Sequence, residues 1–498
     1  MTNIPRIRRV KCDEAKPECG RCTSTGRKCD GYTSASNPAT HQEKQLVRVQ
    51  HNPSKGLVFG TQYNALERRT FDFFRAKTAP CMSGYFQDPV WERLALQASH
   101  TEPAIRYAIN ALGALHEERC LRADAVKTNA ELSLIQTDFP VRQYAKALGG
   151  LQKLLGSGKA SINVVLLCAL LCVHYEALQE RFIPALTHAE NAMRLLDPAE
   201  APSNETIEPS LIRAFIRIDL QGTFFIDGRL PSLSFITSAT DNELPKSFTD
   251  LEQARSFVTT WSSRLFKFLR EMAYKHRRDS PGFFPLESLA EAQSYEQVFI
   301  SIDRLLLSFM QKSPAKFTFR EHHGLSMLRV LAMENRILAA ASLYREASFH
   351  DRYLPEMEQM LSICRYVMDA EDPSNRLLSA SLDDGMFRPL SFVVMHCRDS
   401  RTRHSALALL KRLSEGQMSW HVDAITKVVE KIILLEEKDC EMESPRCEDI
   451  AEWKRVHSFE FDAWILAKQK RSKVVVTLEL RPNGMDGEWA YVYEDIEW

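Results

Sequence analysis

Four cysteines lie close together near the start of the chain, and their spacing is the pattern best able to support chemistry. Cys12, Cys19, Cys22 and Cys29 follow the pattern C-x6-C-x2-C-x6-C, and they are four of the twelve cysteines in 498 residues. Thiolates at this density bind a soft or borderline metal ion, which can hold together a short segment that has no apolar core. Disulfides would need an oxidising compartment, and nothing in the N-terminal residues is typical of a secretory signal. We therefore predict that these four thiolates are ligands of a metal ion.

Basic residues surround the cysteines. The first 32 residues contain eight Lys/Arg and four Asp/Glu, although the whole chain has a net charge of −1. This asymmetry predicts an N-terminal segment that binds nucleic acid, followed by a larger part of the chain with another function. A nuclear localisation signal or a solvated basic tail is the alternative interpretation of the same run. The residues that we expect to contact DNA are Arg6, Arg8, Arg9, Lys11, Lys16, Arg21, Arg27 and Lys28.

The segment RIRRVKCDEAKPECGRCTSTGRKCDGY resembles the fungal binuclear zinc-cluster transcription factors, in which six cysteines hold two zinc ions. This resemblance implies that the cofactor is zinc and that Cys12, Cys19, Cys22 and Cys29 are its ligands. The resemblance includes the last four cysteines of that family's pattern, the basic run, the loop proline and the closing C-D-G-Y. The first two cysteines belong at positions 2 and 5, where this chain has Thr2 and Pro5. Two explanations are possible: an upstream exon encodes the missing pair, or the DNA-binding module is degenerate. We favour the first explanation, because the match is complete from Arg6 onward.

The resemblance also implies how DNA would be read. In the family, the basic run forms a short helix that enters the major groove over a CGG-like triplet, and Arg8 and Arg9 match the base-contacting pair. An arginine can bond guanine O6 and N7 together, which is worth about 1–3 kcal/mol of discrimination. The other six basic residues are better placed for phosphates, which fix the register without reading sequence.

Beyond the basic head, the composition is that of an ordinary globular protein, with 44% hydrophobic and 26% charged residues. No apolar stretch reaches the roughly 18 residues of a membrane span. The nearest is VVLLCALLCV at 164–173, which we interpret as a buried helix. Apolar residues recur at helical spacing elsewhere, so we expect helix after helix from about residue 56. The clearest stripes begin at Ile105, Ala406 and Ile425.

A second resemblance appears in this helical part. The segment at 385–420 is similar to the C-terminal signature of the fungal-specific regulatory domain, with an apolar segment, a C-R-D turn, a basic helix and a closing E-G-x-W. Three residues inserted before Trp420 loosen the last of these features. The segments SINVVLLCALLCVHYEAL and AFIRIDLQGTFFIDGR also resemble segments of that domain.

The last residues of the chain differ from the helical part. Apolar residues alternate over 474–480, RPNGMDG supplies turn residues, and aromatic residues alternate over 489–493. This pattern predicts a β-hairpin. An acidic and aromatic activation tail is the alternative that the same residues allow.

Enzyme motifs are incomplete wherever they appear. LLGSGKASI lacks the first glycine and the Ser/Thr of a phosphate-binding loop, and we expect a helix end and a short loop there. HEERC at His116 lacks the second histidine of a zinc protease, and we expect a surface helix face. His322 and His323 are expected to be a solvent-exposed pair. We therefore predict that the chain is not an enzyme.

Taken together, these patterns predict a mainly α protein. We expect a truncated zinc-cluster module at 1–32, a flexible linker at 33–56, a helical regulatory domain at 57–440 and a tail with a β-hairpin at 441–498. The expected function is a nuclear transcription regulator that binds double-stranded DNA and the transcriptional machinery or protein co-regulators, without a membrane. A small-molecule effector and a homodimer are left open. The alternative is a helical co-regulator or scaffold that has lost direct DNA binding.

Overall fold

The computed structural model groups the chain into two units, Met1–Gln62 and Tyr63–Trp498. The residues that it describes are 24, 64–128, 138–158, 160–197, 205–225, 229–233, 243–273, 285–312, 317–370, 385–417, 420–438, 440–460, 473–484 and 487–497. The predicted linker at 33–56 lies outside them. The described helices and strands all belong to the second unit.

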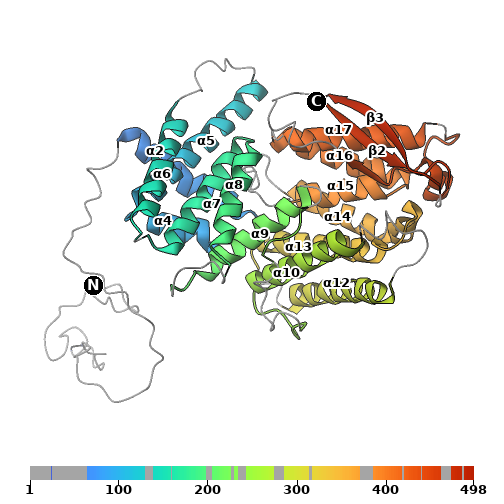
Figure 1. The fold of residues 1–498 in the computed structure, drawn as a ribbon, viewed down its shortest axis with the longest axis horizontal. Coiled ribbons are helices and arrows are strands. Elements are labelled where there is room, and N and C mark those ends of the chain that lie inside the picture. The colour runs from blue at the N-terminus through green and yellow to red at the C-terminus, as the bar shows by residue number, and fades with distance from the viewer. Residues whose placement is uncertain are drawn as a thin grey trace. The chain divides into compact units, whose positions relative to one another are not determined.

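The first part of this unit is a group of helices around one apolar core (Figure 1). Its elements are α2 (Ala65–Phe73), the π-helical turn η1 (Phe74–Thr78), α3 (Ala79–Ser83), the π-helical turn η2 (Val90–Leu94), α4 (Ala95–Ala98), α5 (Pro103–Thr128), α6 (Phe139–Gly156), α7 (Ile162–Leu178), α8 (Phe182–Arg194) and α9 (Pro209–Phe225). Helix α7 contains the apolar run at 164–173, and its residues from Val165 to Val173 are all buried. This confirms the buried helix that the sequence predicted.

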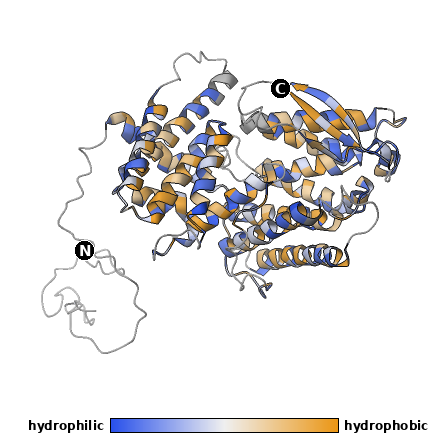
Figure 2. Cartoon of the chain, viewed as in Figure 1, coloured by the Kyte–Doolittle hydropathy of each residue, from blue (hydrophilic) through white to orange (hydrophobic). Residues whose placement is uncertain are grey.

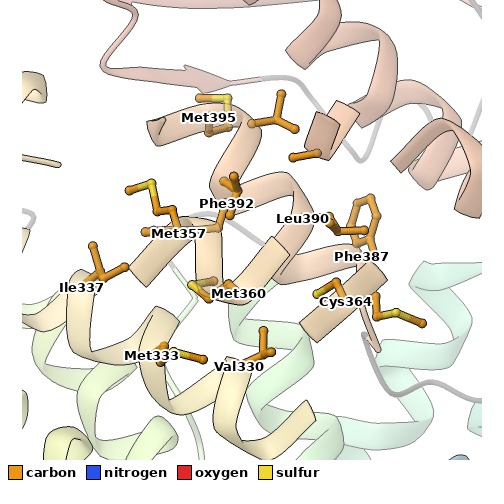
Figure 3. Close-up of a cluster of buried hydrophobic side chains, with 14 of the residues drawn as sticks. Val330, Met333, Ile337, Met357, Met360, Cys364, Phe387, Leu390, Phe392 and Met395 are labelled. Carbon is orange, nitrogen blue, oxygen red and sulfur yellow. The ribbon is translucent and has the colours of Figure 1, made fainter. Parts of the chain in front are cut away.

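The second part has its own core. Its helical elements are α10 (Leu251–Phe268), the π-helical turn η5 (Leu269–Ala273), α12 (Leu286–Lys312), α13 (Phe319–Ala341), the 3₁₀ segment η7 (Ala347–Tyr353), α14 (Leu354–Ala370), α15 (Phe387–His396), α16 (Ser400–Gln417), α17 (Trp420–Glu437) and the short 3₁₀ turns η8 (Cys447–Asp449) and η9 (Glu452–Lys454). Figure 3 shows buried side chains of α13, α14 and α15 pointing toward one another, with methionines from all three helices among them. Methionine suits such a junction because its flexible side chain fills irregular gaps.

Capping residues mark where two helices of this unit begin. Asn64 and Glu67 form a capping box at α2, in which the Asn64 side chain accepts a hydrogen bond from the Glu67 N–H at 2.8 Å. Thr318 and Glu321 form the same arrangement at α13. Such caps satisfy backbone N–H groups that the first turn of a helix leaves without partners.

A small antiparallel sheet comes after the helices. It consists of β1 (Ser458–Glu460), β2 (Lys473–Leu480) and β3 (Ala490–Glu497) in the order β1-β2-β3. The β2–β3 pair runs in register from Lys473 opposite Glu497 to Leu480 opposite Ala490. Every second residue of β2 from Val474 to Leu478 is buried in the core, so the alternation read from the sequence is the inner face of the sheet. The predicted hairpin is confirmed, and β1 is an addition to it.

The predicted helical stripes lie where the sequence placed them. The stripe that begins at Ile105 is buried along α5, the stripe at Ala406 along α16, and most of the stripe at Ile425 along α17. Figure 2 shows the alternation of apolar and polar residues along these helices, whereas α7 is more uniformly apolar. Within the described part of the chain, none of the helices combines the length and the apolar character of a membrane span.

Candidate functional site

The residues predicted to bind zinc and DNA lie outside the described part of the chain. They are Cys12, Cys19, Cys22 and Cys29 for the metal, and Arg6, Arg8, Arg9, Lys11, Lys16, Arg21, Arg27 and Lys28 for DNA. Within the first 62 residues, the structure describes Ser24, an exposed turn residue between the third and fourth cysteines. The zinc and DNA sites therefore remain predictions.

The number and type of the cysteine ligands can nevertheless be compared with what a zinc ion requires. Four thiolates are the number that a structural zinc ion binds in its tetrahedral coordination. The two ions of a six-cysteine cluster would need two more ligands than the segment from Arg6 to Tyr32 contains. The segment thus fits one zinc ion, and the metal would supply the folding energy of a module too short for an apolar core.

The remaining eight cysteines all belong to the second unit of the chain. None of these eight forms a disulfide, and six of them are buried. Among the described residues, no cluster of three or more His, Cys, Asp or Glu side chains could hold a metal ion. The prediction that these cysteines are reduced core residues holds for those six, while Cys120 and Cys440 are partly exposed.

The C-R-D turn that the sequence singled out carries a buried ion-pair network. Arg398 donates to Glu436 Oε1 at 2.7 Å, and Arg403 Nη1 lies 2.6 Å from Glu436 Oε2. The side chains of all three residues are completely inaccessible to solvent. The same Oε1 atom accepts the backbone N–H of Val456 at 2.6 Å. One carboxylate of α17 thus joins the turn, the first part of α16 and the segment that leads into β1.

Electrostatics explain how this carboxylate remains charged. Burial alone would raise the pKa of Glu436, but the charges of Arg398 and Arg403 outweigh burial and hold the pKa below its ordinary value. Removing one partner from such a network leaves an uncompensated buried charge, which destabilises proteins by about 3–5 kcal/mol. We conclude that the C-R-D turn is a structural joint.

A second buried arginine lies at the start of the same signature segment. Arg388 Nε is 2.9 Å from Glu334 Oε1, and Arg388 Nη2 donates to Asn335 Oδ1 at 3.0 Å. The guanidinium also lies over the rings of Phe224 and Phe266, at 5.5 and 5.4 Å from their centroids. These contacts connect α15 with α9, α10 and α13. The basic residue that follows Phe387 is therefore part of the packing between four helices.

The segment AFIRIDLQGTFFIDGR contains a third such arrangement. Arg229 Nη2 lies 2.8 Å from Asp219 Oδ1, and Asp219 Oδ2 accepts the backbone N–H of Leu233 at 2.7 Å. Gly222 makes room for this pair, because a Cβ at that position would lie 3.3 Å from the guanidinium carbon of Arg229. The glycine and the two charged residues therefore act together to fold the chain back after α9.

Two histidine predictions are wrong. His116 is buried, and its Nδ1 lies 3.0 Å from the Thr78 hydroxyl. His323 is also buried and lies 4.1 Å from the ring of Phe319, centroid to centroid. Both positions belong to apolar faces of their helices, which local sequence motifs do not reveal. The expectation for LLGSGKASI is supported, since α6 ends at Gly156 and Gly158 has a positive φ of 63°.

The acidic partners of the buried arginines were missed by sequence reasoning, although a signal was present. Glu436 follows Ile432 and Ile433 at a spacing that continues the apolar stripe of α17. Glu334 lies between Val330 and Ile337 at the same helical spacing in α13. A carboxylate on an apolar stripe predicts a buried cation nearby, because a charge is rarely buried without a partner.

Comparison with models of known protein families identifies the class of protein to which the helical fold and the cysteine motif belong. The Fungal specific transcription factor domain matches residues 69–432, and the Fungal Zn(2)-Cys(6) binuclear cluster domain matches residues 6–39. The chain belongs to the family of fungal zinc-cluster transcription factors. The cluster domain implies that zinc is bound, and the family as a whole consists of regulators of transcription, which are generally not enzymes.

Two curated relatives are similar to part of the chain. The aspercryptin biosynthesis cluster-specific transcription regulator atnN of Emericella nidulans is 29% identical over 327 residues, which cover 59% of this chain and 50% of that protein. The transcription regulator lscL of Purpureocillium lilacinum is 29% identical over 196 residues, which cover 36% of this chain and 44% of that protein. The chain thus spans about half the length of these relatives. No solved structure matches it significantly.

Proposed function

We propose that the chain is a nuclear, zinc-dependent regulator of transcription that binds double-stranded DNA and reads CGG-like triplets. The observation that carries this proposal is the pair of family matches, a zinc cluster at 6–39 followed by a regulatory domain at 69–432. In the proposed arrangement, residues 1–32 form the DNA-binding module and residues 33–56 are the linker that follows it. Residues 57–440 form the regulatory domain, and residues 441–498 form the C-terminal tail. One relative is named for a biosynthesis cluster, so genes that neighbour this one are the first targets to test.

The proposed zinc site uses the thiolates of Cys12, Cys19, Cys22 and Cys29. Zinc supplies the folding energy of the module, on the order of 10 kcal/mol. The protein's own contribution is to present a basic segment in one orientation. The thiolates must be deprotonated to bind, so assembly of the module should weaken as the pH falls.

The proposed DNA-reading pair is Arg8 and Arg9, which would each donate two hydrogen bonds to a guanine. Lys11, Lys16 and Lys28 would contact phosphates together with the remaining arginines of the segment. Phosphate contacts release counterions, so the affinity should fall steeply with salt. The helical unit would act on this binding through a protein co-regulator or a small effector.

A co-regulator without direct DNA binding is the second candidate. The observation that favours it is the presence of Thr2 and Pro5 where the family has its first two cysteines. Such a protein would keep the helical unit and its partners, but its N-terminal arginines would no longer be oriented toward DNA.

The test measures zinc content by mass spectrometry and DNA affinity by fluorescence anisotropy at several salt concentrations. We expect about one zinc per chain for the sequence as it stands, and two when a C-x2-C segment is added before Arg6. A preference of at least about tenfold for a CGG probe over a shuffled probe is expected with the added segment. A chain with no zinc and no salt-dependent affinity in either form belongs to the co-regulator class.

Two alanine variants separate base reading from phosphate binding. Arg9→Ala should remove the preference for CGG, whereas Lys28→Ala should weaken binding to both probes equally and lower the salt slope by about one. An unchanged preference in the Arg9 variant would exclude its base-reading role.

A further inference from the structure

The side of helix α6 that faces solvent carries apolar residues that the packing of the helical unit leaves exposed. The other side of α6 packs on α5, where a Cβ at Gly150 would lie 2.8 Å from the Cβ of Ala104 (Figure 1). Val141 and Leu155 have exposed fractions of 59% and 56%. Leu148 lies midway between them and is half-buried against the core.

These three residues form one row along the helix. Val141, Leu148 and Leu155 recur every seven positions, which is close to two helical turns, so their side chains lie above one another. The row extends about 21 Å along the helix axis at the usual rise per residue. A seven-residue apolar repeat is the spacing against which a second helix packs side by side.

A row of cations lies on the same exposed side. Arg142, Lys146 and Lys153 are spaced by four and seven positions, which places them in a second stripe, and all three are exposed. The sequence of α6 contains no aspartate or glutamate. Within the described part of the chain, none of the three forms an ion pair with a carboxylate. The Lys146 ammonium lies 5.3 Å from the centroid of the Tyr107 ring, which does not neutralise its charge.

The carboxylates closest to this helix do not compensate its charge. Asp138 lies one turn before Arg142, but no ion pair joins these two described residues. Glu67 of α2 is buried, and it accepts hydrogen bonds from the Gln143 side chain at 3.0 Å and the Asn64 N–H at 3.2 Å. We call the exposed side that carries the apolar row and the cationic row the α6 face.

The charge and the apolar row together decide which partner fits the α6 face. The first 32 residues of this chain contain eight Lys/Arg and four Asp/Glu, so the three cations would repel them. Two copies of the face would bring six cations together, with no carboxylate on either helix. The phosphates of DNA would attract the cations but would give Val141 and Leu155 no apolar surface to pack on. An acidic helix with its own apolar row matches both features.

We propose that the α6 face binds an acidic amphipathic helix of a partner protein. The partner's apolar row packs along Val141, Leu148 and Leu155, and its glutamates or aspartates lie beside Arg142, Lys146 and Lys153. This inference goes beyond the proposed DNA-binding function, because the α6 face requires neither zinc nor DNA.

The test measures binding of labelled 18-residue peptides to the full chain by fluorescence anisotropy. The first peptide is a helix of alanine with one row of leucines flanked by glutamates. A second peptide has glutamine in place of every glutamate, and a third has the composition of the first in scrambled order. The third peptide keeps the charge but loses the apolar row, so attraction to the basic N-terminal segment alone would bind it as well as the first.

We expect the first peptide to bind at least about tenfold more tightly than either of the others at low salt. Its advantage over the glutamine peptide should shrink as salt is added. A chelator should leave its binding unchanged, so failure of the DNA-binding proposal would not affect this result. Equal binding of the three peptides, no binding, or binding that disappears with the chelator overturns the proposal.

Variants of the α6 face locate the binding. The double variants Val141→Ser, Leu155→Ser and Lys146→Glu, Lys153→Glu should each weaken binding of the first peptide about tenfold or more. The matched controls replace exposed residues of the same types on α10 and α12, and both should bind as the unchanged chain does. They are Leu286→Ser with Leu307→Ser, and Lys267→Glu with Lys312→Glu.

Three outcomes would contradict this assignment. Equal losses in the α6 variants and the controls would mean that the peptide binds elsewhere. A loss of binding to DNA without CGG in the lysine variant, with peptide binding unchanged, would mean that the face contacts phosphates. A dimer in sedimentation that disappears in the Val141→Ser, Leu155→Ser variant would mean that the face binds a second copy. Circular dichroism should show the same helical content in every variant, because the replaced residues are exposed.

Discussion

Neutralising Glu436 tests the central electrostatic argument about the C-R-D turn. In Glu436→Gln, the side chain keeps its shape, but Arg398 and Arg403 lose the carboxylate that lies 2.7 and 2.6 Å from them. The next carboxylate, Glu437 Oε1, is 4.0 Å from Arg403 Nη1 and cannot replace it. Since all three side chains are inaccessible to solvent, water cannot screen the two guanidinium groups. The expected loss is about 3–5 kcal/mol.

A control on the same helix isolates the effect of burial. Glu430 of α17 pairs with Lys411 at 2.5 Å and Lys427 at 3.4 Å, but these side chains are partly exposed. Glu430→Gln removes the same charge and should cost less than about 1 kcal/mol, because solvent screens such pairs. The two variants therefore differ in burial and little else.

Hydrogen exchange of the α16 and α17 amides measures the loss where it occurs. A protein with two cores need not unfold in one step, so local opening is more informative than a single melting temperature. A loss of 3–5 kcal/mol corresponds to about two to four decades of protection. Replacing Arg398, Arg403 and Glu436 together by methionine should recover most of it. Equal protection in Glu436→Gln and Glu430→Gln would refute the reasoning.

Three further predictions concern other parts of the molecule. Burial lowers the pKa of His116 to about 4, so below a pH of about 6.5 the unfolded chain binds a proton at this histidine and the folded chain does not. The free energy of unfolding should therefore fall by about 2 kcal/mol between pH 8 and pH 5. Urea titrations of the His116→Gln variant should show a smaller fall. The Gly113→Ala variant should destabilise the protein by about 1–3 kcal/mol, because the new Cβ would lie 2.3 Å from the Thr70 carbonyl oxygen. The Gly149→Ala variant, in which the new Cβ has open space around it, should stabilise the protein by about 0.5–1 kcal/mol. Similar shifts of the melting temperature in the two variants would contradict this prediction. Chelating zinc should abolish DNA binding but leave the helical circular dichroism signal intact, and a loss of helix would place the metal elsewhere.

Much of the secondary structure was predictable from residue patterns. The stripes at Ile105 and Ile425 became buried helix faces because a period near 3.6 leaves few other ways to cover apolar side chains. The hairpin was predictable from alternation on both sides of a turn. His116 and His323 were wrongly expected at the surface, because the helices that cover them are distant in the sequence. Only packing shows whether a polar residue on a helix is exposed.

The class of this protein was predictable from local properties of the chain, namely the spacing of four cysteines in a basic segment and the pattern of apolar residues in the remainder. The tertiary structure decided which charges are buried. Arg398 and Glu436 are 38 positions apart, and the pair exists because α15, α16 and α17 pack together. It also decided that, among the strands that the structure describes, β3 pairs with β2 and β2 with β1, because strand order depends on pairing between segments that are distant in the chain. Both features depend on long-range contacts, which residue types at short spacing do not specify.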